Sequence, residues 1–323
     1  MSKPPPLVFG VFPLGISGGP DGVVIGPPDD FGRIGEALQD LAGDGPPLLV
    51  RVYVTFEGSI ASALDQAAQF AQIGSVVDLC LSFHDRDGGV EPWCSFVEQV
   101  VREHGSAVGS IGITNEANLS TVPFAPDGAY PRALEALVDG FLAAAAPKRE
   151  VGATAALGFT AAGDADSPTD ADRFWRAVAQ RGGEAFATAL DFAGLTIYPG
   201  GFDSRPMSTS ELARRTITLL TVFRTQLSTA RISASVPIRV SECGWPTGPG
   251  RTDADQAEAL SAILDAVSSV RAELGVTHWE LFTLRDANSS GPDLFGHFGV
   301  LRDDYSPKPA YATLRTLIRP GQV

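Results

Sequence analysis

The chain has 323 residues, of which 44% are apolar, a share that is ordinary for a globular protein and too high for a disordered one. Its formal net charge of -14 and its scattered Lys and Arg residues do not provide the clustered basic surface that nucleic acids require, so we expect no nucleic-acid partner. No run approaches the roughly 20 apolar residues of a membrane span, and residues 1–6 lack the basic-then-apolar order of a signal peptide, which predicts a cytoplasmic protein without a membrane partner.

Short apolar runs alternate along the chain with stretches in which apolar residues recur at the helical period. The apolar runs predict strands at 7–12, 48–55, 76–83, 110–114, 151–156, 192–198, 236–241 and 278–284. Helices are predicted at about 31–41, 60–71, 92–104, 131–146, 167–178, 208–230, 252–274 and 309–318, with Ser59 and Thr252 as N-caps. The stretch 16–30 is rich in Gly and Pro without periodicity, and it predicts a long loop.

Eight strands that alternate with helices need crossover connections, and such connections produce a parallel sheet. Eight is also the number of strands that closes into a barrel. We therefore predict an α/β fold in which residues 1–323 form one domain, a single (β/α)8 TIM barrel. An open, doubly wound sheet is the alternative.

Two glutamates follow predicted strands at positions where a barrel would present them to a substrate. Glu116 follows the fourth strand and Glu242 follows the seventh. Catalytic residues of such barrels gather at the carboxyl ends of the strands, so we expect the two side chains to reach the same mouth from nearly opposite walls. Taken singly, each glutamate could instead form a structural ion pair or cap a helix.

Three parts of the sequence resemble a known group of enzymes. Thr114-Asn115-Glu116 and Ser241-Glu242-Cys243-Gly244-Trp245 resemble the acid/base and nucleophile motifs of clan A retaining glycoside hydrolases. The third part is similar to the ending of family 39-like and family 5-like members, and consists of Leu284-Arg285-Asp286, Phe298-Gly299-Val300-Leu301 and Lys308-Pro309-Ala310-Tyr311.

This resemblance implies a retaining O-glycosyl hydrolase that cleaves a glycoside or oligosaccharide without a cofactor. It also implies that Glu116 is the general acid/base and Glu242 the nucleophile. Such a reaction needs one protonated and one ionised carboxyl group, about 5 to 5.5 Å apart. A transglycosylase would use the same two glutamates, whereas a non-catalytic carbohydrate-binding barrel would use neither for chemistry.

The resemblance also assigns substrate-binding roles to residues around the two glutamates. Asn115 would contact the sugar 2-hydroxyl, although its amide could instead cap the following turn. Tyr198 would donate a hydrogen bond to Glu242, although it could be a packing residue. Arg51 would lie near the nucleophile, although its guanidinium could neutralise a buried acid elsewhere in the barrel.

Further binding residues are predicted from their positions at strand ends. His84 follows the third strand and would reach the sugar, or else serve as a loop histidine that bonds within the protein. Enzymes of this clan usually carry a Trp platform at the end of the eighth strand, but here Trp279 comes early in that strand. Either Phe282 replaces the platform or Trp245 provides it.

Metal chemistry is disfavoured by the spacing of the possible ligands. The four histidines form neither an HxH nor an HExxH pattern, and the three cysteines have no CxxC spacing, so we predict no metal site and no disulfide. A metal-dependent barrel hydrolase remains the third alternative. The sequence makes no prediction of oligomeric state.

Overall fold

The computed structural model describes residues 5–19, 21–56, 60–163, 168–203 and 205–319. Eight parallel strands close into a barrel in the order β1-β10-β9-β8-β7-β6-β5-β4, which confirms the predicted fold. The barrel strands are β1 (Val8–Phe12), β4 (Leu49–Thr55), β5 (Val76–Ser82), β6 (Ser110–Ile113), β7 (Ala156–Ala162), β8 (Phe192–Ile197), β9 (Ile238–Cys243) and β10 (Val276–Phe282).

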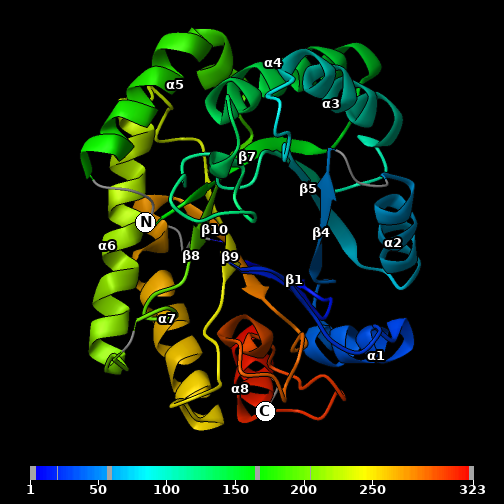
Figure 1. Cartoon of the computed structure of the whole chain (residues 1–323), viewed down its shortest axis with the longest axis vertical. Helices are drawn as coiled ribbons and strands as arrows, with labels where there is room; N and C mark the ends of the chain where they lie inside the picture. Colours follow the sequence, from blue (N-terminus) through cyan, green and yellow to red (C-terminus); the bar gives the residue numbers. More distant parts are fainter. Residues whose placement is uncertain (1–4, 20, 57–59, 164–167, 204, 320–323) are drawn as a thin grey trace.

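Within the described residues, eight α-helices surround the strands and form the outer layer (Figure 1). They are α1 (Phe31–Ala42), α2 (Ile60–Gln72), α3 (Val90–His104), α4 (Ala133–Val151), α5 (Pro168–Ala189), α6 (Thr209–Thr229), α7 (Asp253–Leu274) and α8 (Pro309–Ile318). Two short 3-10 helices lie in the connections, η1 (Asp127–Ala129) and η2 (Leu294–His297). None of the described helices is both long and apolar enough to cross a bilayer.

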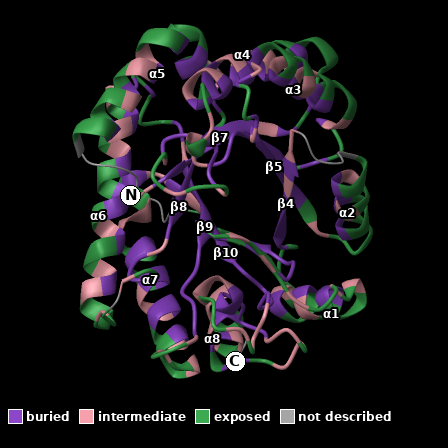
Figure 2. Cartoon of the chain, viewed as in Figure 1, coloured by how far each residue is buried: buried purple, intermediate pink, exposed green. Residues whose placement is uncertain are grey.

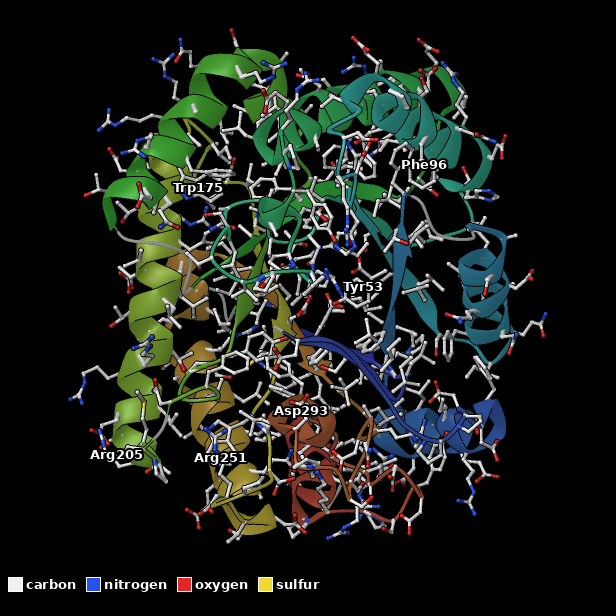
Figure 3. The ribbon with its side chains drawn as sticks, viewed as in Figure 1. Tyr53, Phe96, Trp175, Arg205, Arg251 and Asp293 are labelled. Carbon is white, nitrogen blue, oxygen red and sulfur yellow. The ribbon has the colours of Figure 1, made fainter. Side chains whose placement is uncertain are left out.

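The core lies between the barrel and the inner faces of the helices, as the buried residues in Figure 2 show. Trp175 on α5 (Figure 3) is fully buried, and its ring contacts Phe159 on β7 and Phe223 on α6, so three neighbouring elements share one aromatic cluster. Burying a side chain of this size contributes roughly 2 to 3 kcal/mol. The strands are buried on both faces, as the continuous apolar runs of the sequence indicate.

Local signals set the helix boundaries. Thr252 caps α7 as predicted, because its hydroxyl accepts a hydrogen bond from the backbone N–H of Asp255 while the Asp255 carboxylate accepts one from the N–H of Thr252. The same helix ends where Gly275 adopts a left-handed conformation, with φ of 68°. The predicted cap Ser59, and residue 167 at the predicted start of the fifth helix, lie outside the described residues.

Two sequence predictions about local structure were wrong. The predicted strand 151–156 is instead the end of α4 and its connection, because the helix continues through Pro147 to Val151 and stops at Gly152, which has φ of 67°. The strand β7 follows it. Within the predicted loop 16–30, the strands β2 (Ile16–Gly19) and β3 (Gly22–Ile25) pair as an antiparallel hairpin, since their backbone groups satisfy one another.

Candidate active site

The turn after β6 aims Glu116 into the barrel mouth. Thr114 and Glu116 both adopt left-handed backbone conformations, with φ of 66° and 53°. Such a conformation costs a non-glycine residue roughly 1 kcal/mol, and it reverses the chain directly after the strand. The backbone N–H of Glu116 then donates to the carbonyl oxygen of Thr160 on β7, at 3.0 Å, which fixes the turn against the neighbouring strand.

A β-bulge presents Glu242. Between Val240 and Cys243, β9 contains one residue more than either neighbouring strand, as the shifts of its register with β8 and β10 show. Bulges bend a strand and re-aim its side chains, and they are frequent next to active sites. Across this bulge Thr196 on β8 is the register partner of Glu242, and its hydroxyl donates a hydrogen bond to Oε1 of Glu116. Thr196 therefore lies beside Glu242 in the sheet and also bonds to Glu116.

Both carboxylate oxygens of Glu242 accept a hydrogen bond from a phenol. The hydroxyl of Tyr53 donates to Oε1 at 2.5 Å, and the hydroxyl of Tyr198 donates to Oε2 at 2.6 Å. Burial is the main cause that raises the pKa of each phenol well above its usual range. Both phenols therefore stay neutral donors at neutral pH, and they hold Glu242 in one orientation.

Arg51 holds the phenol of Tyr53 in place beside Glu242. Residues 51 and 53 point to the same side of β4 because side chains alternate along a strand, and Arg51 Nε donates to the Tyr53 hydroxyl oxygen at 2.8 Å. The Nη1 of Arg51 lies 2.6 Å from Asp78 Oδ2, and its Nε lies 4.0 Å from Glu242 Oε1. Arg51 thus pairs with the buried acid Asp78 and also lies near the candidate nucleophile. The two roles considered for it from the sequence are therefore compatible.

The surroundings of Glu116 favour its protonated form. Its pKa rises to about 8, first because burial penalises the charged carboxylate and second because the negative charge of Glu242 lies nearby. The hydrogen bond from Thr196 acts in the opposite direction and is the smaller effect. At neutral pH, Glu116 therefore carries a proton that it can donate.

Asp127 holds the backbone beside Glu116. Its carboxylate accepts hydrogen bonds from the N–H groups of Phe83, at 3.0 Å, and Asn115, at 2.7 Å. Burial is the main cause that raises the pKa of Asp127 to about 6. The Oδ1 atom of Asn115 is buried and has no hydrogen-bond partner among the described residues. Asn115 is thus fixed through its backbone, while its buried side-chain oxygen has no hydrogen-bond partner in the described part of the chain.

His84 contacts the loop that carries these residues. Its Nε2 lies 2.9 Å from the carbonyl oxygen of Ala125 and 3.4 Å from Oδ1 of Asp127. Its ring stacks on Tyr130, with 4.7 Å between the ring centroids. The structure therefore uses this nitrogen inside the protein, to brace the loop between β6 and α4.

Phe282 and Trp245 lie in different surroundings. Phe282 ends β10 and stacks on Phe12 at the end of β1, with 5.4 Å between centroids and an interplanar angle of 7°. Phe12 in turn contacts Tyr53, so this stack borders the nucleophile. Trp245 is only 3% exposed and lies beneath the guanidinium of Arg251, at 4.7 Å. The structure thus does not support Trp245 as a sugar platform, because its neighbours already cover the ring.

Several site residues were missed by sequence reasoning. Tyr53 and Thr196 could have been found from the alternation of side chains along strands whose neighbours were already suspected. Glu280 lies on β10 two residues before Phe282, fully buried, with both oxygens lacking a hydrogen-bond partner in the described part of the chain. Burial is the main cause that raises its pKa well above the usual range, and its Oε2 lies 4.0 Å from Nη1 of Arg51. Asp127 could not be found in this way, since it begins the short 3-10 helix η1 in the connection from β6 to α4.

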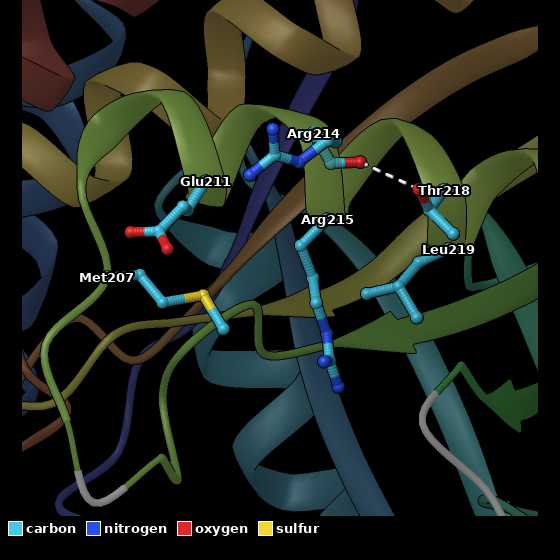
Figure 4. A pocket seen from close by; sticks show the side chains of 6 residues that line it. All are labelled: Met207, Glu211, Arg214, Arg215, Thr218 and Leu219. Carbon is cyan, nitrogen blue, oxygen red and sulfur yellow. Dashed lines mark hydrogen bonds between the residues drawn. The ribbon is translucent and has the colours of Figure 1, made fainter.

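Two hollows in the described surface are lined by neither Glu116 nor Glu242. One of about 440 Å³ lies beside the first turns of α6, where Glu211, Arg214 and Arg215 are among its lining residues (Figure 4). Another of about 550 Å³ is lined by residues that follow Glu116, such as Asn118, and by Phe174 of α5. Over the described ranges, no group of three or more His, Cys, Asp or Glu side chains is arranged to hold a metal ion.

Comparison with solved structures finds the same fold. The chain superposes on a beta-glucosidase, 1317, with a TM-score of 0.61 and 19% identity, over 90% of this chain and 88% of that one. It also superposes on a beta-glucosidase from Exiguobacterium marinum, with a TM-score of 0.63 and 14% identity over all of both chains. A family 39 glycoside hydrolase from Bacteroides cellulosilyticus WH2 matches with a TM-score of 0.62 and 15% identity, over 97% of this chain and 63% of that one.

No protein-family model matches the sequence, and no curated protein matches it significantly. At the identities found for the solved structures, the likeness is one of fold. It places the chain among (β/α)8 barrels of the architecture that these glycoside hydrolases use.

Proposed function

We propose that the protein is a retaining glycoside hydrolase in which Glu116 is the general acid/base and Glu242 the nucleophile. The observation that carries the proposal is the contrast between the two glutamates at one end of the barrel. Burial and the nearby charge of Glu242 raise the pKa of Glu116, so it holds a proton, whereas Glu242 accepts hydrogen bonds from two phenols and lies 4.0 Å from a guanidinium nitrogen. Its fold, shared with solved beta-glucosidases and a family 39 enzyme, supports a carbohydrate substrate.

In the first step, an oxygen of Glu242 attacks the anomeric carbon while the bond from that carbon to the leaving group breaks. Glu116 gives its proton to the departing oxygen, so the leaving group departs as a neutral alcohol. The products are a covalent glycosyl-enzyme ester on Glu242 and an ionised Glu116. The phenols of Tyr53 and Tyr198 orient the attacking carboxylate.

The second step follows from the change of charge. Once Glu242 is esterified, its negative charge no longer raises the pKa of Glu116, so Glu116 becomes a more stable carboxylate. It takes a proton from a water molecule, whose oxygen attacks the anomeric carbon and releases Glu242. The cycle consumes the glycoside and one water, and each attack inverts the anomeric carbon, so the configuration is retained overall.

Two further residues fit substrate binding. A sugar hydroxyl would provide a partner for the buried Oδ1 of Asn115, and a buried acceptor without a partner costs about 1 to 3 kcal/mol. Phe282 is 9% exposed and stacks on Phe12 next to Tyr53, a hydrogen-bond partner of Glu242, whereas Trp245 is 3% exposed and covered by Arg251. Of these two residues, we assign the platform role to Phe282.

The test is turnover of 4-nitrophenyl glycosides, with proton NMR of the first-formed sugar. We expect hydrolysis of at least one glycoside and a product with the anomeric configuration of the substrate. Glu242→Gln should abolish turnover, whereas Glu258→Gln, at an exposed position on α7, should not. A product of inverted configuration would refute the double displacement. Lack of turnover on every glycoside, with sugar binding unaffected by Glu242→Gln, would favour a non-catalytic binding barrel.

The same assay separates hydrolysis from transglycosylation. With an added alcohol or sugar acceptor, a transglycosylase transfers most of the glycosyl group to the acceptor, whereas a hydrolase releases mainly free sugar. We expect mainly free sugar.

A further inference from the structure

Phe202 is a large apolar side chain that stays exposed in a firmly held loop. It lies in the connection from β8 to α6, and its side chain is 51% exposed. This connection starts at the carboxyl end of β8, which is the end of the barrel where the two glutamates lie. A single exposed apolar residue is common on protein surfaces, but Phe202 is also held in place by its neighbours.

The backbone around Phe202 is fixed by a side chain from a different loop. The guanidinium of Arg251, just before α7 (Figure 3), donates hydrogen bonds to the carbonyl oxygens of Gly201, at 2.6 Å, and Asp203, at 2.9 Å. Arg251 lies over the buried ring of Trp245, which supports it from below. The residues on both sides of Phe202 are therefore anchored to the loop that follows the nucleophile strand.

The ring of Phe202 is braced by other aromatic rings. It stacks on Phe295 of η2, with 5.4 Å between centroids and an interplanar angle of 25°. It also contacts Phe298 at 5.9 Å and Tyr198 at 5.3 Å. Gly19 of the β2–β3 hairpin lies so close to Phe295 that an added Cβ would come within 3.0 Å of that ring. The half of Phe202 that remains exposed is thus held in place, which lowers the entropic cost of binding a ligand.

The position of Phe202 indicates which part of a substrate it would meet. The ring of Tyr198 contacts Phe202, and its hydroxyl donates a hydrogen bond to Glu242. Phe202 is therefore separated from the candidate nucleophile by one aromatic ring. Glu116 enters from β6, which is three strands from β9 and two from β8 in the ring of eight. The leaving group departs beside Glu116, whereas the glycosyl group stays on Glu242.

We propose that Phe202 is a second sugar platform, which binds the ring next to the cleaved sugar on its glycosyl side. This inference rests on the proposed function and adds a substrate class to it: oligosaccharides whose glycosyl portion has at least two rings. Pyranose rings have apolar C–H faces that pack on aromatic rings, and aromatic residues combine a large contact area with few rotatable bonds.

The test compares 4-nitrophenyl monosaccharide glycosides with the matching disaccharide glycosides, where the same nitrophenol leaves. We expect the intact protein to have the higher kcat/KM on the disaccharide glycosides. Phe202→Ala should lower kcat/KM on them about tenfold and change it less than about twofold on the monosaccharide glycosides. Phe202→Tyr keeps the ring and should keep the preference. An unchanged preference in Phe202→Ala would overturn the inference.

Phe124, in the connection from β6 to α4, provides a matched control. Phe124 is also exposed, at 47%, but it lies in the loop that follows Glu116. Phe124→Ala should leave the ratio of kcat/KM between disaccharide and monosaccharide glycosides unchanged. A changed ratio would place the second sugar ring beside Phe124 and overturn the inference. Failure of the proposed function is a separate outcome, because the unaltered protein would then hydrolyse neither class.

Discussion

The hydroxyl of Tyr53 donates a hydrogen bond to Glu242 and accepts one from Arg51. Arg51 is in turn held by Asp78, at 2.6 Å. Hydrogen bonds in such a chain polarise one another, and the terminal bond to a charged group is the strong one. The chain ends at a single carboxylate oxygen, so Tyr53 and two buried charged side chains, Arg51 and Asp78, together orient one nucleophile.

Removal of the Tyr53 hydroxyl should therefore lower the rate without unfolding the protein. A hydrogen bond to a charged group contributes about 1.5 to 3 kcal/mol, so Tyr53→Phe should lower kcat/KM on an aryl glycoside roughly 10- to 100-fold. The loss should appear mainly in kcat, because the nucleophile and not the substrate is affected. Tyr311→Phe, on the outer helix α8, is the matched control and should retain full activity. Wild-type kcat in Tyr53→Phe would exclude this orienting role.

The protonated state of Glu116 predicts a dependence on the leaving group. Glu116→Ala should lower kcat/KM by about 10² to 10⁴ on glycosides of poor leaving groups such as simple alcohols. Glycosides of 2,4-dinitrophenol should lose far less in their first step, since this phenol departs without a proton. Steady-state kinetics over a series of leaving groups measures the difference. Equal losses across the series would contradict Glu116 as the acid.

The pKa of Glu116, raised to about 8, predicts the alkaline side of the pH profile. The first step needs the protonated acid, so kcat/KM should stay high below this pKa and fall as the pH rises through about 8. In Glu116→Ala, assayed with a 2,4-dinitrophenyl glycoside, this alkaline decrease should disappear. A decrease that persists in the variant would belong to another group.

Most of the fold could be predicted from the sequence because the βα alternation is a local signal repeated around the whole chain. The hairpin β2–β3 was missed because its first strand contains Gly18 and Gly19, which weaken the strand pattern. The strand β7 was placed too early because an Ala-rich segment suits either a helix or a strand. In both cases contacts with distant parts of the chain decide the local structure.

Glu116 follows its strand as the sequence predicts, whereas Glu242 lies inside β9 and not after it. The bulge that presents Glu242 appears only when three strands are aligned. Tyr53 and Thr196 depend on the same alignment. Asp127 reaches the site from a loop, and only the folded chain brings it to Asn115.

Asp127 provides a test of what holds the acid in place. Asp127→Ala would leave the N–H groups of Phe83 and Asn115 without an acceptor, which should lower the free energy of unfolding by about 2 to 4 kcal/mol in urea titrations. Asp44→Ala, at an exposed loop position, is the control and should change it by less than about 0.5 kcal/mol.

The pH dependence of Asp127→Asn sharpens this prediction. Burial raises the pKa of Asp127 to about 6 in the folded protein, above the usual value of an unfolded Asp near 3.9. The folded state thus retains a proton that the unfolded chain has released, so this carboxyl group stabilises the protein less as the pH rises from about 4 to above 6. Asn has no proton to lose. The destabilisation caused by Asp127→Asn should therefore shrink over this range, and a constant or growing difference in unfolding free energy would contradict the raised pKa.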